Sequence, residues 1–324
     1  MKIKEYIEYK LNELKSNTKE LEVFSSDEEL SNFIYKTIMS KKFRKFSVAP
    51  EYTDYIKESI DNSIKDKLPI RFSLQFGGYK LWRLEETPEV DWAELFALMY
   101  YSKWLKPIAE VYKPGVIFDF SSDEVIVERL NNIPKSDTQS YADSFGNVIK
   151  FLEDYIPENL KFTLTPTGSF YTPEEFEKDL EDKTEKKKEE FGGLPKLDDQ
   201  RKAMTELNVR LKPGQDDDPL WREKSELLHQ AYYAVDKLKP YTGAKDKMRV
   251  SSYKLKGFNS LVVGTTKTSI AKFWVGVGAL KSIGDTYKEY VLSPSQIEKT
   301  QLTKETISIE GLEGENFKGV KVFE

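Results

Sequence analysis

The sequence predicts an α/β protein: a Rossmann-like, mostly parallel sheet flanked by helices, with an N-terminal helical appendage and an antiparallel β extension in the C-terminal third. Two observations predict the parallel core. Residues 69–76 alternate apolar and polar side chains at the period of a strand and stop at Gly77 and Gly78. A long helix pattern then leads to a second β-rich run at residues 116–120, and strand, crossover helix and strand form a right-handed parallel unit.

The crossover helix is predicted to be buried on most of its surface. It opens at Asp91 with Glu94 three positions later, which is the spacing of a capping box. Residues 113–115, Lys-Pro-Gly, end it before the second strand. Apolar residues fall on nearly every side of the helix, at Leu95, Phe96, Leu98, Met99, Trp104, Leu105 and Ile108.

The carboxyl ends of the strands form the predicted ligand-binding edge. A third strand is expected at residues 161–165, and a turn follows it at residues 166–168. Open parallel sheets bind their ligands outside the carboxyl ends of the strands. This rule places several backbone and polar groups on one rim: Gly77, Gly78, Tyr79, Lys80, Ser121, Ser122 and Asp123.

The flanking segments divide the chain into three predicted parts. Residues 1–66 carry charged helix patterns with one apolar face, which predicts a helical appendage. Residues 67–300 are the predicted α/β core, and residues 301–324 are a predicted C-terminal β extension. Four short runs split by glycines predict added antiparallel strands, at residues 248–253, 260–263, 272–280 and 287–292.

Composition excludes several classes of function. The 324 residues are 39% hydrophobic, which is enough for a large core, and the net charge of -5 provides no basic field for nucleic acid. The absence of cysteine excludes disulfides and thiolate chemistry, and one histidine leaves little for a histidine metal site or a Ser-His-Asp triad. No apolar run approaches the roughly 20 residues of a membrane span. We therefore expect a soluble, cytoplasmic protein with no nucleic-acid or membrane partner.

Two polar features have both a structural and a functional interpretation. His229 falls beside the apolar stripe of a predicted helix, where it is either a packed, hydrogen-bonded residue or a catalytic one. Residues 216–218 are three consecutive aspartates, which indicate either a metal site or the start of the helix that follows Pro219.

Three positions are the strongest candidates for binding chemistry. The diglycine at residues 77–78, with Lys80 and Arg83 beyond it, is either a plain turn or a cradle for a phosphate or carboxylate. Asp123 is either a general base that can also hold an amine, or a cap for the next segment. Arg249 lies inside an apolar strand pattern, so it needs either a structural carboxylate or an anionic ligand.

Segments in the first half of the chain resemble the pyoverdine/dityrosine-biosynthesis family, whose best-known members are isocyanide synthases. Residues 69–76 are similar to that family's strand before its Phe-Pro-Ala-Lys-Ser-Pro-Asn loop. Residues 89–94, Glu-Val-Asp-Trp-Ala-Glu, resemble the Pro-Asp-Leu-Ala-Glu that opens its next helix. Residues 112–115 resemble its Tyr-Pro-Pro-Gly element, and Ser122-Asp123 resembles its Ser-Asp-Gly element.

The second half continues the resemblance, which spans residues 27–295, but departs from it at two functional positions. Residues 249–253 are similar to the family's Arg-Leu-Ser-Ile-His, and residues 273–277 to its Pro-Trp-His-Gly-Val. Tyr253 and Val275 replace the two family histidines, and the Lys-Ser-Pro-Asn loop has become Gly-Tyr-Lys-Leu at residues 78–81. These changes remove the groups best suited to proton transfer near neutral pH.

The resemblance implies an isocyanide-synthase-like enzyme that acts on the amine of an amino acid, with a sugar phosphate as carbon donor. It implies that Arg249 and Lys80 hold anionic groups, Asp123 takes the amine or a proton, Tyr253 serves as an acid and Trp274 walls the pocket. The predicted catalytic residues are Asp123, Tyr253 and Lys80, and the predicted substrate-binding residues are Gly77, Gly78, Arg83, Ser122, Arg249, Ser251, Lys272 and Trp274.

A second interpretation is a non-catalytic relative that keeps the pocket as a sensor or as a partner subunit, and the missing histidines favour it. No metal or other cofactor is expected on either interpretation. The oligomeric state stays open.

Overall fold

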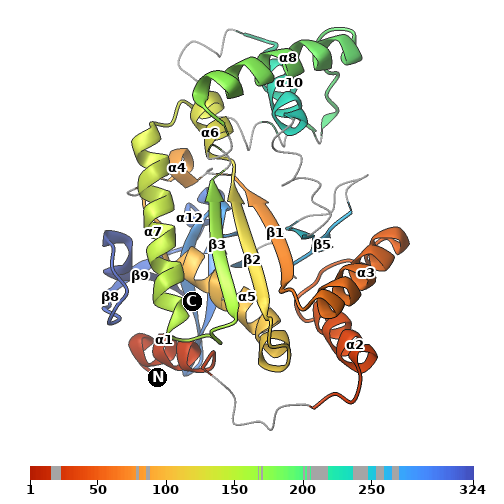
Figure 1. The fold of residues 1–324 in the computed structure, drawn as a ribbon. Coiled ribbons are helices and arrows are strands. Elements are labelled where there is room, and N and C mark those ends of the chain that lie inside the picture. Colours follow the sequence, from red (N-terminus) through yellow and green to blue (C-terminus); the bar gives the residue numbers. More distant parts are fainter. Residues whose placement is uncertain are drawn as a thin grey trace.

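The core of the computed structural model is a five-stranded, entirely parallel sheet (Figure 1). Its order is β3-β2-β1-β4-β5. The strands are β1 (Ile70–Phe76), β2 (Val116–Ser122), β3 (Leu160–Pro166), β4 (Met248–Ser251) and β5 (Leu261–Val262). The structure describes residues 1–15, 23–77, 80–84, 88–166, 168, 171–199, 201–202, 205, 218–235, 247–252, 259–264 and 270–324. The predicted α/β class with a mostly parallel core is confirmed.

Helices link the strands and flank the sheet. The helix α5 (Trp92–Val111) joins β1 to β2 and begins with the expected capping box of Asp91 and Glu94. None of the described helices is long and apolar enough to cross a membrane. The other helices are α1 (Ile3–Asn12), α2 (Asp27–Ile38), α3 (Pro50–Asp66), α4 (Lys80–Arg83), α6 (Glu124–Asn131), α7 (Lys135–Glu153), α8 (Pro173–Phe191), α10 (Trp221–Ala234) and α12 (Pro294–Ile297).

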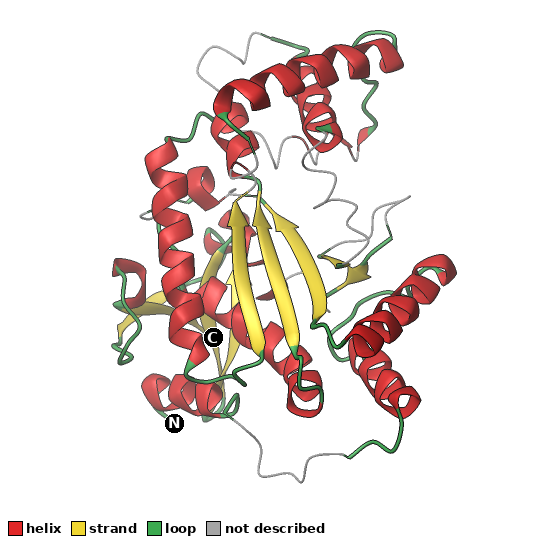
Figure 2. Cartoon of the chain, in the orientation of Figure 1, coloured by secondary structure: helices red, strands yellow, loops and turns green. Residues whose placement is uncertain are grey.

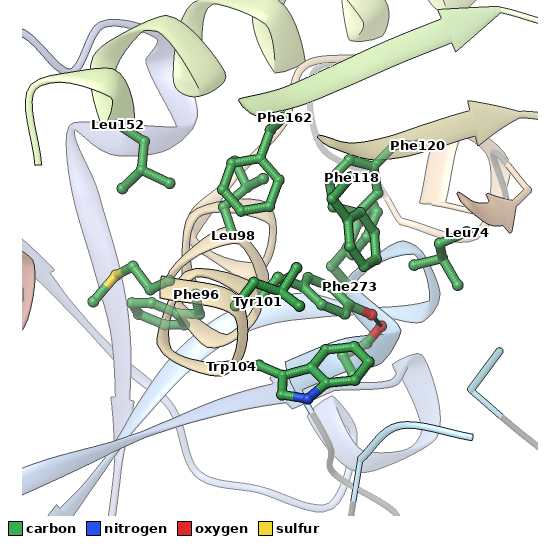
Figure 3. Close-up of a cluster of buried hydrophobic side chains, with 14 of the residues drawn as sticks. Leu74, Phe96, Leu98, Tyr101, Trp104, Phe118, Phe120, Leu152, Phe162 and Phe273 are labelled. Carbon is green, nitrogen blue, oxygen red and sulfur yellow. Dashed lines mark hydrogen bonds between the residues drawn. The ribbon is translucent and has the colours of Figure 1, made fainter. Parts of the chain in front are cut away.

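The register of the parallel sheet sorts its side chains onto two faces. Paired residues of parallel strands point the same way, so Phe72 of β1 shares a face with Phe118 of β2 and Phe162 of β3. This face packs against α5 and α7; the rings of Tyr101 and Phe118 are 4.5 Å apart. Figure 3 shows the aromatic cluster that results, with side chains of the sheet meeting those of α5. We call this the apolar face.

The opposite face of the same strands is polar. Apart from Ile117, the alternate residues there are polar: Arg71, Ser73 and Gln75 of β1, Asp119 and Ser121 of β2, Lys161, Thr163 and Thr165 of β3, and Arg249 of β4. In the view of Figure 2 the described helices lie behind β1, β2 and β3, beside them or beyond their ends. Parallel sheets are usually apolar on both faces, so this polar face is unusual.

The C-terminal third differs from its prediction in two respects. Residues 248–251 and 261–262 are parallel strands of the core sheet, so the antiparallel direction expected for those two runs is wrong. Short strands bounded by glycines carry no signal for direction, which long-range pairing decides. Lys272 lies in the 3-10 helix η3 (Ile270–Val275), and the strand begins only at Val277.

A second, four-stranded sheet lies beyond the core, and its order is β7-β6-β9-β8. β6 (Val277–Ile283) and β7 (Thr286–Leu292) form the expected antiparallel hairpin. β9 (Gly319–Phe323) pairs in parallel with β6 and antiparallel with β8 (Thr303–Thr306). The short helix η4 (Glu315–Phe317) precedes β9.

The second sheet packs so closely on α5 that position 278 has no room for a side chain. A Cβ there would lie 2.3 Å from the amide nitrogen of Ala93 and 2.4 Å from the carbonyl carbon of Trp92, and the Gly278 N–H donates to Asp91 Oδ1. We expect Gly278→Ala to lower the free energy of unfolding by about 3 kcal/mol in urea titrations, because backbone cannot give way as a flexible side chain can. Gly146→Ala in α7, where a Cβ meets nothing within 4 Å, should raise it by up to about 1 kcal/mol. Equal effects of the two changes would contradict this packing.

Candidate functional site

The strand order creates a topological switch point between β1 and β4. The chain proceeds from β1 to β2 and β3 in one direction, and then returns to place β4 and β5 on the other side of β1. Ligands of doubly wound sheets bind in the crevice outside the carboxyl ends of the strands at such a point. The residues at the carboxyl ends of β1, β2 and β4 are therefore the candidates for a ligand site.

Asp123 follows β2 at this edge and is 3% exposed. Its Oδ1 accepts hydrogen bonds from Gln75 Nε2 at 2.7 Å and from the Tyr232 hydroxyl at 3.3 Å. Its side chain makes no capping hydrogen bond to α6, although it occupies the N-cap position. The carboxylate is therefore committed to β1 and α10 and not to capping its own helix.

Burial raises the pKa of Asp123 to about 7, although the hydrogen bond from Gln75 opposes this shift. The negative charge of Glu124 adds to the rise, while the Tyr232 hydrogen bond and the positive charge of Arg249 reduce it. A carboxyl group that titrates near neutral pH can both take and return a proton.

Arg249 is held on β4 by the helical appendage. Its backbone N–H donates to the hydroxyl of Tyr52 on α3 at 2.6 Å, and the same hydroxyl donates to the Arg249 carbonyl at 3.3 Å. Arg249 pairs with Ser73 of β1, so its side chain belongs to the polar face. Its side chain is half-buried, and the positive charge of this side chain lowers the pKa of the Asp123 carboxyl group.

A second group of polar residues lies on the same face, and of these only Ser121 was predicted from the sequence. Asp119 Oδ1 accepts from the hydroxyls of Thr163 at 2.7 Å and Thr165 at 2.6 Å, and its Oδ2 lies 3.1 Å from Lys247 Nζ. Ser121, 1% exposed, lies between Gln75 and Thr165 in the register, and its Oγ has no hydrogen-bond partner among the described residues. The signal was present in the sequence as polar residues at alternate positions of three consecutive strands.

Lys80 lies in a separate buried cluster. Its Nζ lies 2.9 and 2.8 Å from the two carboxylate oxygens of Glu94 and 3.1 Å from Asp91 Oδ1. The hydroxyl of Tyr141 on α7 donates to Glu94 Oε1 at 2.8 Å. Lys80, from the segment that departs from the family's loop, therefore meets Asp91 and Glu94, from a segment that resembles the family.

The charged groups of this cluster shift one another's pKa values. Burial raises the pKa of Glu94 to about 7, with Lys80 opposing and Asp91 adding to the rise. Burial alone would lower the pKa of Lys80, but Asp91 and Glu94 together raise it. The Lys80 ammonium therefore remains charged and contacts two carboxylates of its own chain, whereas we had expected it to hold an anionic group of the substrate.

The remaining predicted residues lie at several places. Gly77 is buried at the end of β1, and Ser251 Oγ lies 2.7 Å from Ser260 Oγ. Trp274 packs in the aromatic core, with its ring 6.0 Å from that of Phe76, and therefore lies on the apolar side of the sheet. Burial lowers the pKa of Lys272, and the charge of Lys45 adds to this shift. Gly78, Tyr253 and the side chain of Arg83 lie outside the described residues.

The structure describes two of the residues for which the sequence allowed both a structural and a functional interpretation, Asp218 and His229. Asp218 Oδ1 accepts from the backbone N–H of Leu220 at 3.0 Å, as a residue at a helix start does, and its Oδ2 accepts from Lys224. Asp216 and Asp217 lie outside the described residues. Within the described ranges, no group of three or more His, Asp and Glu residues could hold a metal ion. Burial lowers the pKa of His229 on α10, which favours the neutral imidazole.

A cavity of about 700 Å³ opens on the other side of the strand ends. Phe76, Ser122, Leu164 and Pro166 line it, and their registers place all four on the apolar face. Ser122 is the predicted site residue that lines this cavity. Ser122 and Asp123 are neighbours in the chain, yet Ser122 lines the cavity on the apolar side of the sheet and Asp123 bonds to Gln75 of the polar face.

Asp123 should make stability depend on pH. The pKa of this carboxyl group rises from 3.8 to about 7 on folding, so between these values the folded chain keeps a proton that the unfolded chain has lost. The free energy of unfolding therefore falls as pH rises through this window. Asp123→Asn removes this titration. Its free energy of unfolding, relative to that of the natural chain, should therefore be higher at about pH 8 than at about pH 4 by on the order of 3 kcal/mol in urea titrations.

A matched change should have the opposite sign. Hydrogen bonds from Lys224 and Leu220 lower the pKa of the exposed Asp218, so the natural chain gains a little stability as this group ionises. Asp218→Asn should therefore become slightly less stable relative to the natural chain as pH rises. An Asp123→Asn curve parallel to that of the natural chain would contradict the burial of this carboxyl group.

Comparison with known proteins agrees with the architecture. No protein-family model matches the chain, and a search of curated proteins finds no matching sequence. Among solved structures, the PvcA protein from Pseudomonas aeruginosa matches with a TM-score of 0.54 at 14% identity, over 91% of this chain and 99% of that chain. At the level of fold, this chain is similar to PvcA.

Proposed function

We propose that the chain is a PvcA-like biosynthetic enzyme that binds an amino acid at the switch point and uses Asp123 to deprotonate its amine. One observation carries this proposal: a buried carboxyl group with a pKa near 7 lies within electrostatic reach of Arg249 at the carboxyl ends of β1, β2 and β4. Perturbed carboxyl groups at such edges are typical of active sites.

The two charges complement a zwitterion. Asp123 would accept the ammonium group as a hydrogen-bond donor, and Arg249 would pair with the carboxylate. One proton then passes from the ammonium to Asp123, which leaves a neutral, nucleophilic amine and a protonated carboxyl group. Burial favours this step because it destabilises the charged form of Asp123.

Gln75 and Tyr232 support the same step. Both donate hydrogen bonds to Oδ1, which fixes the orientation of the carboxyl group. Because both described hydrogen bonds are made to Oδ1, we place the amine on Oδ2. The family resemblance adds a sugar phosphate as the donor of the carbon that joins the amine, with Tyr253 as the acid.

We propose that Lys80 is the ion-pair partner of Glu94 and does not bind the substrate. Its ammonium is buried and already contacts Glu94 and Asp91. Its charge lowers the pKa of Glu94 and so offsets part of the effect of burial. We therefore assign Lys80 a positioning role at the start of α5.

The second candidate is a non-catalytic protein that binds the same zwitterion as a sensor or partner subunit. The replacement of both family histidines by Tyr253 and Val275 favours it, because no imidazole is left at those positions to move protons. Turnover separates the two candidates.

Incubation with an amino-acid mixture and pentose phosphates should yield new products by mass spectrometry. Asp123→Asn should reduce product formation at least 100-fold, because an amide cannot take the proton, while ligand-induced thermal stabilisation remains. Stabilisation by amino acids without product in the natural chain would favour the sensor. Full turnover by Asp123→Asn would contradict the assigned base.

Arg249→Ala should weaken amino-acid binding at least tenfold on either candidate, measured by calorimetry. Arg249→Lys, which keeps the charge but loses the planar fork, should lie between the alanine variant and the natural chain. Unchanged affinity in a folded Arg249→Ala protein would show that the carboxylate is bound elsewhere.

A further inference from the structure

The cavity on the apolar side of the strand ends is distinct from the Asp123–Arg249 site. Its volume of about 700 Å³ lies within the range of small-molecule sites. It is enclosed by the ends of β1, β2 and β3 together with α6, α7 and the start of α8. Asp123 and Arg249 are absent from its described lining. The proposed zwitterion site therefore does not account for this cavity.

The floor of the cavity is apolar and largely aromatic. Phe76 of β1, Tyr141 of α7 and Phe176 of α8 line it and are buried. The ring centroids of Phe76 and Tyr141 lie 6.4 Å apart, and the ring of Tyr171 meets that of Phe176 edge to face at 5.6 Å. Four aromatic rings therefore line one cavity, where a bound ring would add ring–ring contacts to the burial of apolar area.

The polar groups beside this floor are bonded within the protein. The Ser122 hydroxyl donates to Glu124 Oε2 at 2.6 Å, and the Gly168 N–H donates to Glu124 Oε1 at 2.6 Å. The Tyr141 hydroxyl donates to Glu94 Oε1 at 2.8 Å. These side chains are therefore engaged before any ligand binds.

The other charged groups of the described lining are paired or exposed. Glu128 accepts a hydrogen bond from Thr138, and Arg129 forms an ion pair with Glu177. Lys135 and Glu177 are exposed, which places them at the rim of the cavity. A charged ligand that moved onto the aromatic floor would give up its hydration beside groups that already have partners, and this desolvation is unfavourable.

We propose that this cavity is a second ligand site, which takes an uncharged aromatic molecule whose ring lies among Phe76, Tyr141 and Phe176. This inference goes beyond the proposed function, because it concerns the opposite face of the sheet and a ligand without charge. It needs neither Asp123 nor Arg249.

The test compares three probes that share one ring system and differ in charge: naphthaleneethanol, naphthaleneacetate and naphthaleneethylamine. Near neutral pH the first is uncharged, the second is an anion and the third is a cation. In isothermal titration calorimetry we expect the alcohol to bind at least tenfold more tightly than either ion, because only the ions lose the hydration of a full charge on the aromatic floor.

Two substitutions that fill the cavity should weaken binding of the alcohol at least tenfold. They are Ala142→Phe, which fills it from α7, and Leu164→Trp, which fills it from β3. Gly146→Phe, one turn further along α7 where a Cβ meets nothing within 4 Å, is the matched control and should leave the affinity unchanged. Arg249→Ala should also leave it unchanged, because Arg249 belongs to the other face.

Three outcomes would overturn the proposal: binding of either ion as tightly as the alcohol, no binding of the alcohol, or undiminished binding to both filled variants when circular dichroism shows them folded. Loss of alcohol binding in folded Arg249→Ala would also overturn it, because the probe would then occupy the zwitterion site. Failure of either proposal is distinguishable, since the filled variants act on one cavity and Arg249→Ala acts on the other site.

Discussion

In-register pairing of β1 with β2 and β3 is the constraint on which the rest of the structure depends. Because paired residues of parallel strands point the same way, one set of alternate positions forms a continuous aromatic face. Burial of that face against α5 and α7 fixes the register, since a slip of one residue would turn Phe118 and Phe120 toward the polar side. The polar face is the necessary counterpart, and it carries the groups that can recognise a ligand.

Both perturbed carboxyl groups arise from this arrangement. Asp123 follows β2 where the chain leaves the sheet, and Glu94 lies in the first turn of α5; both side chains are buried. Burial raises the pKa of each toward neutrality, but their surroundings differ. Glu94 has an ammonium partner in direct contact, whereas Asp123 has neutral donors and a more distant guanidinium. This difference is why we assign proton transfer to Asp123 and a positioning role to the Lys80–Glu94 pair.

The sheet separates two chemically different environments at one edge. The turn at residues 122–124 passes through this edge, so that Ser122 and Glu124 face the apolar cavity while Asp123 bonds to Gln75 and Tyr232. A zwitterion suits the environment of opposite charges formed by Asp123 and Arg249. The similarity to PvcA in fold does not decide the ligand, because folds host many functions and the site decides which.

Local patterns in the sequence determined the α/β class, the first two strands, the capping box at Asp91 and Glu94, and the hairpin at residues 277–292. These features follow from periodicity and capping, which depend on near neighbours. Only the tertiary structure decided the parallel direction of β4, the contact of Lys80 with Glu94, and the division of Ser122 from Asp123. Those outcomes depend on which distant segments share a face and which charges lose water together, and no local pattern specifies either.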